Sequence, residues 1–104
     1  MTNTLVIATL LLTASWERFS DTGRVMATGR RFDPVAMTCA TWDYPLGTTV
    51  RVTDVHNGSA VLVRVTDRPA KEFGNRIDLS PRAFSQLNGL ALGVCEVKTE
   101  VVKP

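Results

Sequence analysis

A carboxyl group at the end of a strand-like segment is the first feature of this sequence that could do chemistry. The segment Val63–Thr66 alternates apolar and polar residues, and Asp67 ends it before a loop that opens with Arg68 and Pro69. Small folds often place catalytic side chains in such loops, because the strand fixes one end of the loop. A carboxyl there can donate or accept a proton. Asp before a loop is also a common turn former, so both interpretations stay open at this point.

The other residue types that carry chemistry are few and widely spaced. The single histidine, His56, lies beside an Asn-Gly turn, where a side chain points into solvent and out of reach of a substrate. Cys39 and Cys95 are far apart and have no metal-ligand spacing, so we expect no metal site and no other cofactor. The two cysteines form either a disulfide in an exported protein or two buried free thiols.

The composition describes a single globular domain over residues 1–104. Of the 104 residues, 44% are hydrophobic and 21% are charged, which suits one core and leaves no room for a second. The net charge is only +2 and no tract is rich in lysine or arginine, so nucleic acid is not an expected partner.

The apolar run Leu5–Leu12 has two interpretations. It is too short to cross a bilayer as a helix, so we expect no stable membrane span. Its length suits the central region of a signal peptide, but no lysine or arginine precedes it and no clear cleavage site follows. Its β-branched residues favour a buried strand within the fold, with an atypical export signal as the alternative.

Two alternating segments predict a hairpin that helps to position Asp67. Thr49–Thr53 and Ala60–Thr66 flank Asn57-Gly58, a pair that favours a type I′ turn. The inward face of this hairpin should bury five valines: Val50, Val52, Val61, Val63 and Val65.

The remaining elements complete a mostly-β chain. Ser80 and Pro81 predict the start of a short helix that buries Ala83, Phe84 and Leu87 and ends at Asn88-Gly89. Further strands are predicted at Ala36–Thr41 and Val94–Val102, and Glu17–Arg31 is predicted to be a long loop. About six strands and one helix in a chain of this size indicate a small barrel or a sandwich.

An ordered set of segments forms a pattern that covers roughly residues 11–102. The segments are Ala14–Trp16, Met26–Pro34, Met37–Ala40, Pro45–Thr53, Asn57-Gly58, Val63–Arg68, Ile77–Ser80, Gly93-Val94 and Val97–Val101. Together they resemble the rare lipoprotein A-like family of septal ring lytic transglycosylases, which shares its fold with expansins and barwin-like proteins. The resemblance implies a six-stranded double-psi β-barrel with one short helix.

The resemblance also implies an activity on the cell wall. Enzymes of this family cleave the β-1,4 bond between N-acetylmuramic acid and N-acetylglucosamine, preferring glycan strands stripped of stem peptides. The muramyl 6-hydroxyl attacks its own anomeric carbon and leaves a 1,6-anhydro end. An internal nucleophile removes the need for a second carboxyl, because one acid can protonate the leaving oxygen and then accept the hydroxyl proton.

Several residues take expected roles from this resemblance. Asp67 aligns with the catalytic acid of the family, and Arg68 would bind substrate or tune Asp67. Trp42 and Tyr44 would offer faces for stacking sugars, whereas core packing is favoured for Trp16.

Two positions depart from the family pattern. Thr41 stands where the family has a histidine that assists catalysis, and threonine cannot shuttle a proton near neutral pH. We expect Thr41 to orient Asp67 or bind a sugar, with Asp43 as a candidate second acid. Pro69 replaces a glycine, which changes the backbone options of the loop beside Asp67.

Two functions therefore remain, with a weaker third. The chain is either a peptidoglycan lytic transglycosylase or a non-catalytic, expansin-like module that binds peptidoglycan or another polysaccharide in the same groove. The third is a structural barrel within an envelope or phage assembly. We expect a monomer that binds glycan strands in the cell envelope, periplasmic or secreted, or that is associated with a phage.

Overall fold

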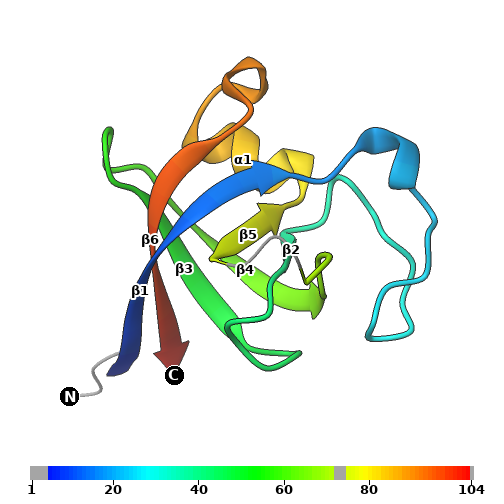
Figure 1. Ribbon diagram of the computed structural model, residues 1–104, viewed down its shortest axis with the longest axis horizontal. Coiled ribbons are helices and arrows are strands. Elements are labelled where there is room, and N and C mark those ends of the chain that lie inside the picture. The colour runs from blue at the N-terminus through cyan, green and yellow to red at the C-terminus, as the bar shows by residue number, and fades with distance from the viewer. Residues whose placement is uncertain (1–4, 72–74, 104) are drawn as a thin grey trace.

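The computed structural model describes residues 5–71 and 75–103, which form a closed β-barrel with one α-helix beside it (Figure 1). The predicted six strands and one short helix are confirmed within these residues. The elements are β1 (Leu5–Trp16), β2 (Thr38–Ala40), β3 (Thr49–Asp54), β4 (Ala60–Asp67), β5 (Arg76–Leu79), α1 (Pro81–Leu87) and β6 (Cys95–Lys103).

The order of the strands brings distant parts of the sequence together. Around the barrel they follow β1-β5-β2-β4-β3-β6, and β6 closes the barrel by pairing with β1. β1 is parallel to β5 and β2 is parallel to β4, whereas all other neighbours are antiparallel. Closure leaves no edge strand exposed, so the barrel is a rigid support for the loops at its ends.

The predicted hairpin forms, but its turn differs from the prediction. β3 and β4 pair with Val50 opposite Val63 and Val52 opposite Val61, and all five predicted valines are buried in one core. The type I′ turn is wrong, because Asn57 lacks the positive φ that this turn requires and only Gly58 has one, at 77°. A five-residue loop, residues 55–59, joins the strands instead.

The side chain of Asp54 explains this longer loop. Its Oδ1 accepts hydrogen bonds from the backbone N–H groups of His56 and Asn57, and its Oδ2 accepts one from the Asn88 amide at the end of α1. Burial disfavours the charge of this fully buried carboxylate, but the three hydrogen bonds outweigh burial and lower its pKa. Asp54 therefore fixes the hairpin loop against the helix.

The helix begins and packs as the sequence predicts. Ser80 caps α1 by accepting a hydrogen bond from the Ala83 N–H at 3.2 Å, and Pro81 is the first helical residue. Ala83, Phe84 and Leu87 are buried against the barrel.

The N-terminal run is a strand of the barrel, as favoured from the sequence. β1 pairs with β5 on one side and β6 on the other, and Leu12 and Ala14 lie in the core. No helix among the described residues is long and apolar enough to cross a membrane.

The segment between β1 and β2 is the predicted long loop, and it extends from one side of the barrel (Figure 1). It contains one 3-10 turn at Phe19–Asp21 and an isolated bridge between Val25 and Arg31. Met26 and Phe32 are buried, so the loop has apolar anchors of its own.

The two cysteines are buried free thiols, so the disulfide alternative is wrong for this structure. Cys39 lies on β2, which pairs with β4 and β5, whereas Cys95 lies on β6, which pairs with β1 and β3. The barrel order therefore separates them by two intervening strands on either side. Burial raises the pKa of both thiols, that of Cys95 to about 11, which suppresses the reactive thiolate.

The contacts of Asp54 predict that Asp54→Ala destabilises the protein by about 2–3 kcal/mol, since three N–H donors lose a buried acceptor. Chemical denaturation measures this loss. His56→Ala is the matched control, because its exposed side chain is removed while its N–H to Asp54 remains. Equal stabilities of Asp54→Ala and His56→Ala would contradict the role given to Asp54.

Candidate active site

Strand register lines up four residues at one end of the barrel. Ser15 of β1 is opposite Asp78 of β5, Asp78 is opposite Ala40 of β2, and Ala40 is opposite Asp67 of β4. These residues come from four neighbouring strands, so their relative positions are fixed by backbone hydrogen bonds. Two carboxyl groups, those of Asp67 and Asp78, are thus placed on either side of the small residue Ala40.

The Asp67 carboxyl is buried and held by three donors. Its Oδ2 accepts a hydrogen bond from the Arg24 guanidinium at 2.7 Å, and its Oδ1 accepts from the N–H groups of Ala27 at 3.0 Å and Arg68 at 2.9 Å. Arg24 and Ala27 belong to the long loop after β1. Asp67 therefore orders that loop against the end of β4, and it acts only as an acceptor in these contacts.

A second carboxyl, Glu17, lies directly after β1 and lines the same pocket. Its backbone N–H donates to the carbonyl of Leu79, and only 9% of the residue is exposed. One carboxyl oxygen lies 3.9 Å from the Arg24 nitrogen that binds Asp67. Neither oxygen has a hydrogen-bond partner among the residues that the structure describes.

The environment of Glu17 keeps it protonated at neutral pH. Burial and the nearby carboxylates of Asp67 and Asp78 raise its pKa to about 8, although Arg24 opposes them. A carboxyl group that stays neutral near pH 7 can donate a proton.

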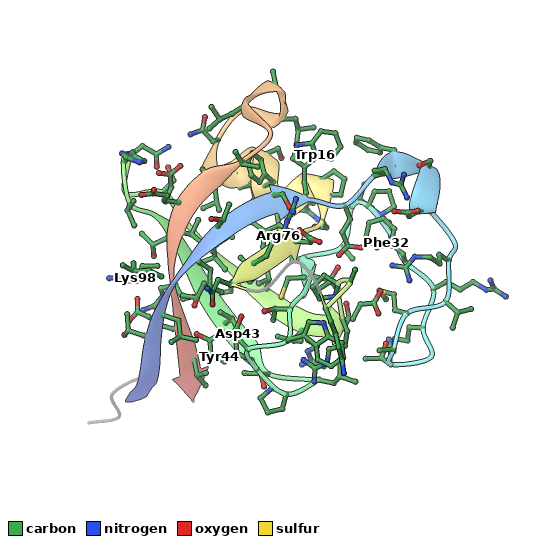
Figure 2. The ribbon with its side chains drawn as sticks, in the orientation of Figure 1. Trp16, Phe32, Asp43, Tyr44, Arg76 and Lys98 are labelled. Carbon is green, nitrogen blue, oxygen red and sulfur yellow. The ribbon has the colours of Figure 1, made fainter. Side chains whose placement is uncertain are left out.

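Asp78 has its own partners. The hydroxyl of Ser15 donates to Asp78, and the Arg76 Nε donates to both Ser15 and Asp78 at 3.0 Å. Figure 2 shows Arg76 beneath β1, in the middle of the barrel as drawn. Ser15, Arg76 and Asp78 line the same pocket as Asp67.

Thr41 and Asp43 do not line the pocket that contains Asp67. Thr41 is fully buried, and its hydroxyl bonds to Asp43 and to the Arg76 carbonyl, both at 3.2 Å. Its backbone N–H donates to the Asp67 carbonyl at 3.1 Å. The side chain of Thr41 therefore makes no hydrogen bond to Asp67, as its hydroxyl turns toward Asp43 and β5 instead, and only its backbone contacts Asp67.

Arg68 points away from the Asp67 carboxyl. Its guanidinium donates to the carbonyls of Thr41 and Tyr44 at 2.5 and 2.6 Å, and it lies 5.3 Å from the centre of the Trp42 ring. Arg68 still lines the pocket, but Arg24 is the cation that binds Asp67.

The three aromatic candidates have different environments. Trp42 is 48% exposed, and its ring is held by a hydrogen bond to the Pro69 carbonyl and by the Lys71 ammonium group 5.0 Å from its centre. Tyr44 is buried and bonds to Thr99, so its role as a sugar-stacking face is wrong. Trp16 packs against the core, as favoured, and its indole N–H donates to the Leu90 carbonyl. Figure 2 shows Tyr44 low on the barrel, well away from Trp16.

Glu17 and Arg24 are the site residues that sequence reasoning missed. Both lie in or beside a polar, glycine-punctuated stretch that predicts only a loop. The sequence holds one indication of Glu17: it follows a predicted strand, much as Asp67 stands at the end of another.

These residues enclose a pocket of about 260 Å³. Pockets that enclose a whole small ligand have volumes of about 300–1,000 Å³, so this one can admit only a short portion of a polymer. Its titratable lining includes Glu17, Asp67 and Asp78 beside Arg24 and Arg76. Among the described residues no group of three or more His, Cys, Asp or Glu side chains is placed to hold a metal ion.

Solved structures share this fold. A Streptomyces papain inhibitor aligns with a TM-score of 0.76 at 23% identity, covering 97% of this chain and 100% of its own. An expansin from Clavibacter michiganensis, solved as a variant in complex with cellohexaose, aligns with a TM-score of 0.73 at 20% identity, covering 92% of this chain and 51% of its own. At these identities the likeness shows the fold alone, a double-psi β-barrel.

The fold and the site together place this chain in the class of double-psi β-barrel proteins, with a pocket of acidic and basic side chains at one end of the barrel. Within that class, the family model described as lytic transglycolase matches residues 10–99, and the chain belongs to this family. The resemblance found in the sequence is therefore confirmed.

Curated relatives agree with this assignment. A protein of Nostoc sp. named probable endolytic peptidoglycan transglycosylase RlpA is 48% identical over 80 residues, which are 77% of this chain and 22% of the relative. Endolytic peptidoglycan transglycosylases RlpA of Pseudomonas aeruginosa and Neisseria meningitidis are 39% and 40% identical over 88% of this chain. The chain spans 27% and 38% of their respective lengths.

The raised pKa of Glu17 predicts a pH dependence of stability. The folded protein keeps a proton on Glu17 that the unfolded chain, with an ordinary pKa of 4.5, releases, so folding takes up a proton between pH 4.5 and about 8. The contribution of Glu17 is fully present below pH 4.5 and is lost as the pH rises through about 8. In this window the free energy of unfolding falls by up to about 1.4 kcal/mol per pH unit.

Chemical denaturation of the parent and of Glu17→Gln at pH 5, 6, 7 and 8 tests this prediction. The amide cannot ionise, so the free energy of unfolding of the variant should fall less steeply with pH than that of the parent. The difference in favour of the variant should be largest at pH 8. Glu96→Gln, which changes an exposed carboxyl, should keep the parental slope. Parallel curves for the parent and Glu17→Gln would show that Glu17 titrates normally.

Proposed function

We propose that this chain is the catalytic barrel of a peptidoglycan lytic transglycosylase. It would cleave the β-1,4 bond between N-acetylmuramic acid and N-acetylglucosamine and leave 1,6-anhydro ends. The observation that carries this proposal is the Asp67 carboxyl, held by three donors in a pocket at the barrel end, in a chain of the lytic transglycolase family. The names of the curated relatives give the substrate class.

Asp67 is the acid/base in this proposal. The muramyl 6-hydroxyl attacks its own anomeric carbon, and its proton needs an acceptor close to the attacking oxygen. Arg24, Ala27 and Arg68 hold Asp67 in one orientation, which supplies an acceptor at a fixed position. Because the nucleophile belongs to the substrate, the site needs neither an activated water nor a covalent intermediate.

Other residues would support Asp67 without contacting the reacting atoms. Thr41 is a positioning residue, since its N–H binds the Asp67 carbonyl and its own carbonyl binds Arg68. Asp43 acts through its hydrogen bond to Thr41. Trp42, half exposed beside the loop that follows Asp67, would contact the glycan outside the pocket.

The proposed partner is the glycan strand of peptidoglycan, and the proposed location is the cell envelope. A non-catalytic, expansin-like module is the second candidate. It is favoured by the fold shared with an expansin and by the buried Thr41 at the position of a catalytic histidine in the family. Association with a phage particle is compatible with either candidate, since both require contact with peptidoglycan.

Digestion of purified sacculi by this chain, followed by mass spectrometry, distinguishes these functions. A transglycosylase releases fragments with 1,6-anhydro ends, whereas a hydrolase releases ends that contain an added water. A binding module releases nothing and sediments with the sacculi.

In the same assay, Asp67→Asn should reduce release of anhydro fragments by about a hundredfold or more, because the amide cannot accept the hydroxyl proton. Binding to sacculi should remain, since the amide keeps the shape of the side chain and its oxygen can still accept from the N–H groups of Ala27 and Arg68, although the bond from Arg24 is lost. Asp33→Asn is the matched control: Asp33 is exposed, outside the pocket, and accepts a bond from the Val35 N–H that asparagine can also accept. Parental rates for Asp67→Asn would remove Asp67 from the mechanism.

A further inference from the structure

Glu17 is a buried carboxyl in the proposed active site that the mechanism above does not use. It lines the pocket with Asp67 and Asp78, and it lies within 3.9 Å of the Arg24 nitrogen that also binds Asp67. A buried carboxyl with two unpartnered oxygens is costly to fold, because each oxygen loses its hydrogen bonds to water. Such a cost in a pocket of titratable groups points to a function.

We propose that Glu17 is a second catalytic residue and the general acid of the reaction, whereas Asp67 is the base. This inference rests on the proposed transglycosylase activity and divides between two carboxyls the proton transfers that one carboxyl would otherwise perform in turn.

The hydrogen bonds of the two carboxyls favour this division. Oδ1 of Asp67 already accepts bonds from two backbone N–H groups, whereas Oδ2 accepts only one, from the Arg24 guanidinium, so Oδ2 keeps a lone pair with which to accept the 6-hydroxyl proton. Neither oxygen of Glu17 has a hydrogen-bond partner within the described part of the chain, and its ion-pair contact with Arg24 is longer, at 3.9 Å. No hydrogen bond of the Glu17 carboxyl has to break for it to donate to a glycan oxygen, but both of its oxygens are covered by protein atoms, so a bound glycan has to displace those atoms to reach them.

The charges that surround Glu17 also keep a proton on it. The carboxylates of Asp67, from β4, and Asp78, from β5, oppose a third negative charge, and Asp21 from the long loop adds a smaller repulsion. Arg24 from the long loop favours the charge, but it is half exposed and is bound more closely by Asp67. Arg76, which also lines the pocket, is bound to Asp78. Burial adds to the repulsion and raises the pKa of Glu17 to about 8.

The proposed step balances without any added reactant. The Glu17 carboxylic acid gives its proton to the glycosidic oxygen as the bond from that oxygen to the muramyl anomeric carbon breaks. The muramyl 6-oxygen bonds to the same carbon and gives its proton to the Asp67 carboxylate. Glu17 ends as a carboxylate and Asp67 as an acid. After the products leave, the proton on Asp67 passes to solvent and Glu17 takes up another, which restores the starting state.

Two substrates separate acid catalysis from every other role of Glu17. Sacculi have a sugar leaving group that needs a proton, whereas a 4-nitrophenyl β-glycoside of an N-acetylmuramic-acid-terminated oligosaccharide releases a weakly basic phenolate that does not. Glu17→Gln should lose about a hundredfold or more on sacculi and stay within about tenfold of the parent on the aryl glycoside. Asp67→Asn should lose activity on both, because the 6-hydroxyl proton needs an acceptor in either case.

A pH profile gives a second readout. The activity of the parent on sacculi should fall above pH 8, by about tenfold per pH unit, as Glu17 loses its proton. Its activity on the aryl glycoside should lack this decline. Glu96→Gln is the matched control, since Glu96 is exposed and outside the pocket, and it should match the parent on both substrates. Thermal unfolding confirms that each variant is folded.

Failures of the two proposals can be told apart. An active parent whose Glu17→Gln variant keeps its rate on sacculi overturns the role of Glu17 alone. Equal losses on both substrates also overturn it, because they would make Glu17 a residue that positions the glycan. A folded parent that forms no anhydro product from either substrate overturns the transglycosylase activity, and the role of Glu17 with it.

Discussion

The hydrogen bonding of the buried Asp67 carboxyl is the constraint on which the site depends. A buried carboxylate is tolerated only when donors replace the water it loses, and two of its three donors come from the long loop after β1. Satisfying Asp67 therefore draws residues Arg24 and Ala27 onto the end of β4. This contact closes one side of the pocket and brings the guanidinium of Arg24 near Glu17. The hydrogen bonding of Asp67 thus orders the loop and places the positive charge of Arg24 near the Glu17 carboxyl.

The Arg24 guanidinium lies closer to the carboxyl of Asp67 than to that of Glu17. Arg24 lies 2.7 Å from Asp67 but 3.9 Å from Glu17, and Asp67 has two backbone donors that Glu17 lacks. Two carboxyls in one pocket can take opposite roles in catalysis when their environments separate their protonation. Here the difference between the two environments comes from their unequal distances to Arg24 and from the backbone donors of Asp67. The paired strands around the pocket hold these positions fixed.

The barrel itself does not distinguish an enzyme from a binding module. An expansin and a papain inhibitor have similar folds, so the function resides in the side chains at the barrel end. Thr41, which stands where the resemblance leads us to expect a histidine, is buried and binds Asp43 and backbone groups. In the proposed mechanism the Glu17 carboxyl, which lines the pocket and has no hydrogen-bond partner among the described residues, supplies a second proton donor.

The sequence by itself determined the elements of this protein. Alternating valines, the Ser80–Pro81 helix start and the position of Asp67 at a strand end are local patterns, and each was confirmed as a structural feature. Only the tertiary structure decided which side chains meet. Two of the three donors to Asp67, Arg24 and Ala27, lie 43 and 40 positions away, and Tyr44 and Thr99, which form a buried pair, lie 55 apart. Such contacts follow from barrel closure and strand register, which join segments through space and leave no periodic signal in the sequence. For the same reason the sequence gives no sign of the burial and raised pKa of Glu17, because both depend on residues from other strands that the folded barrel brings next to it.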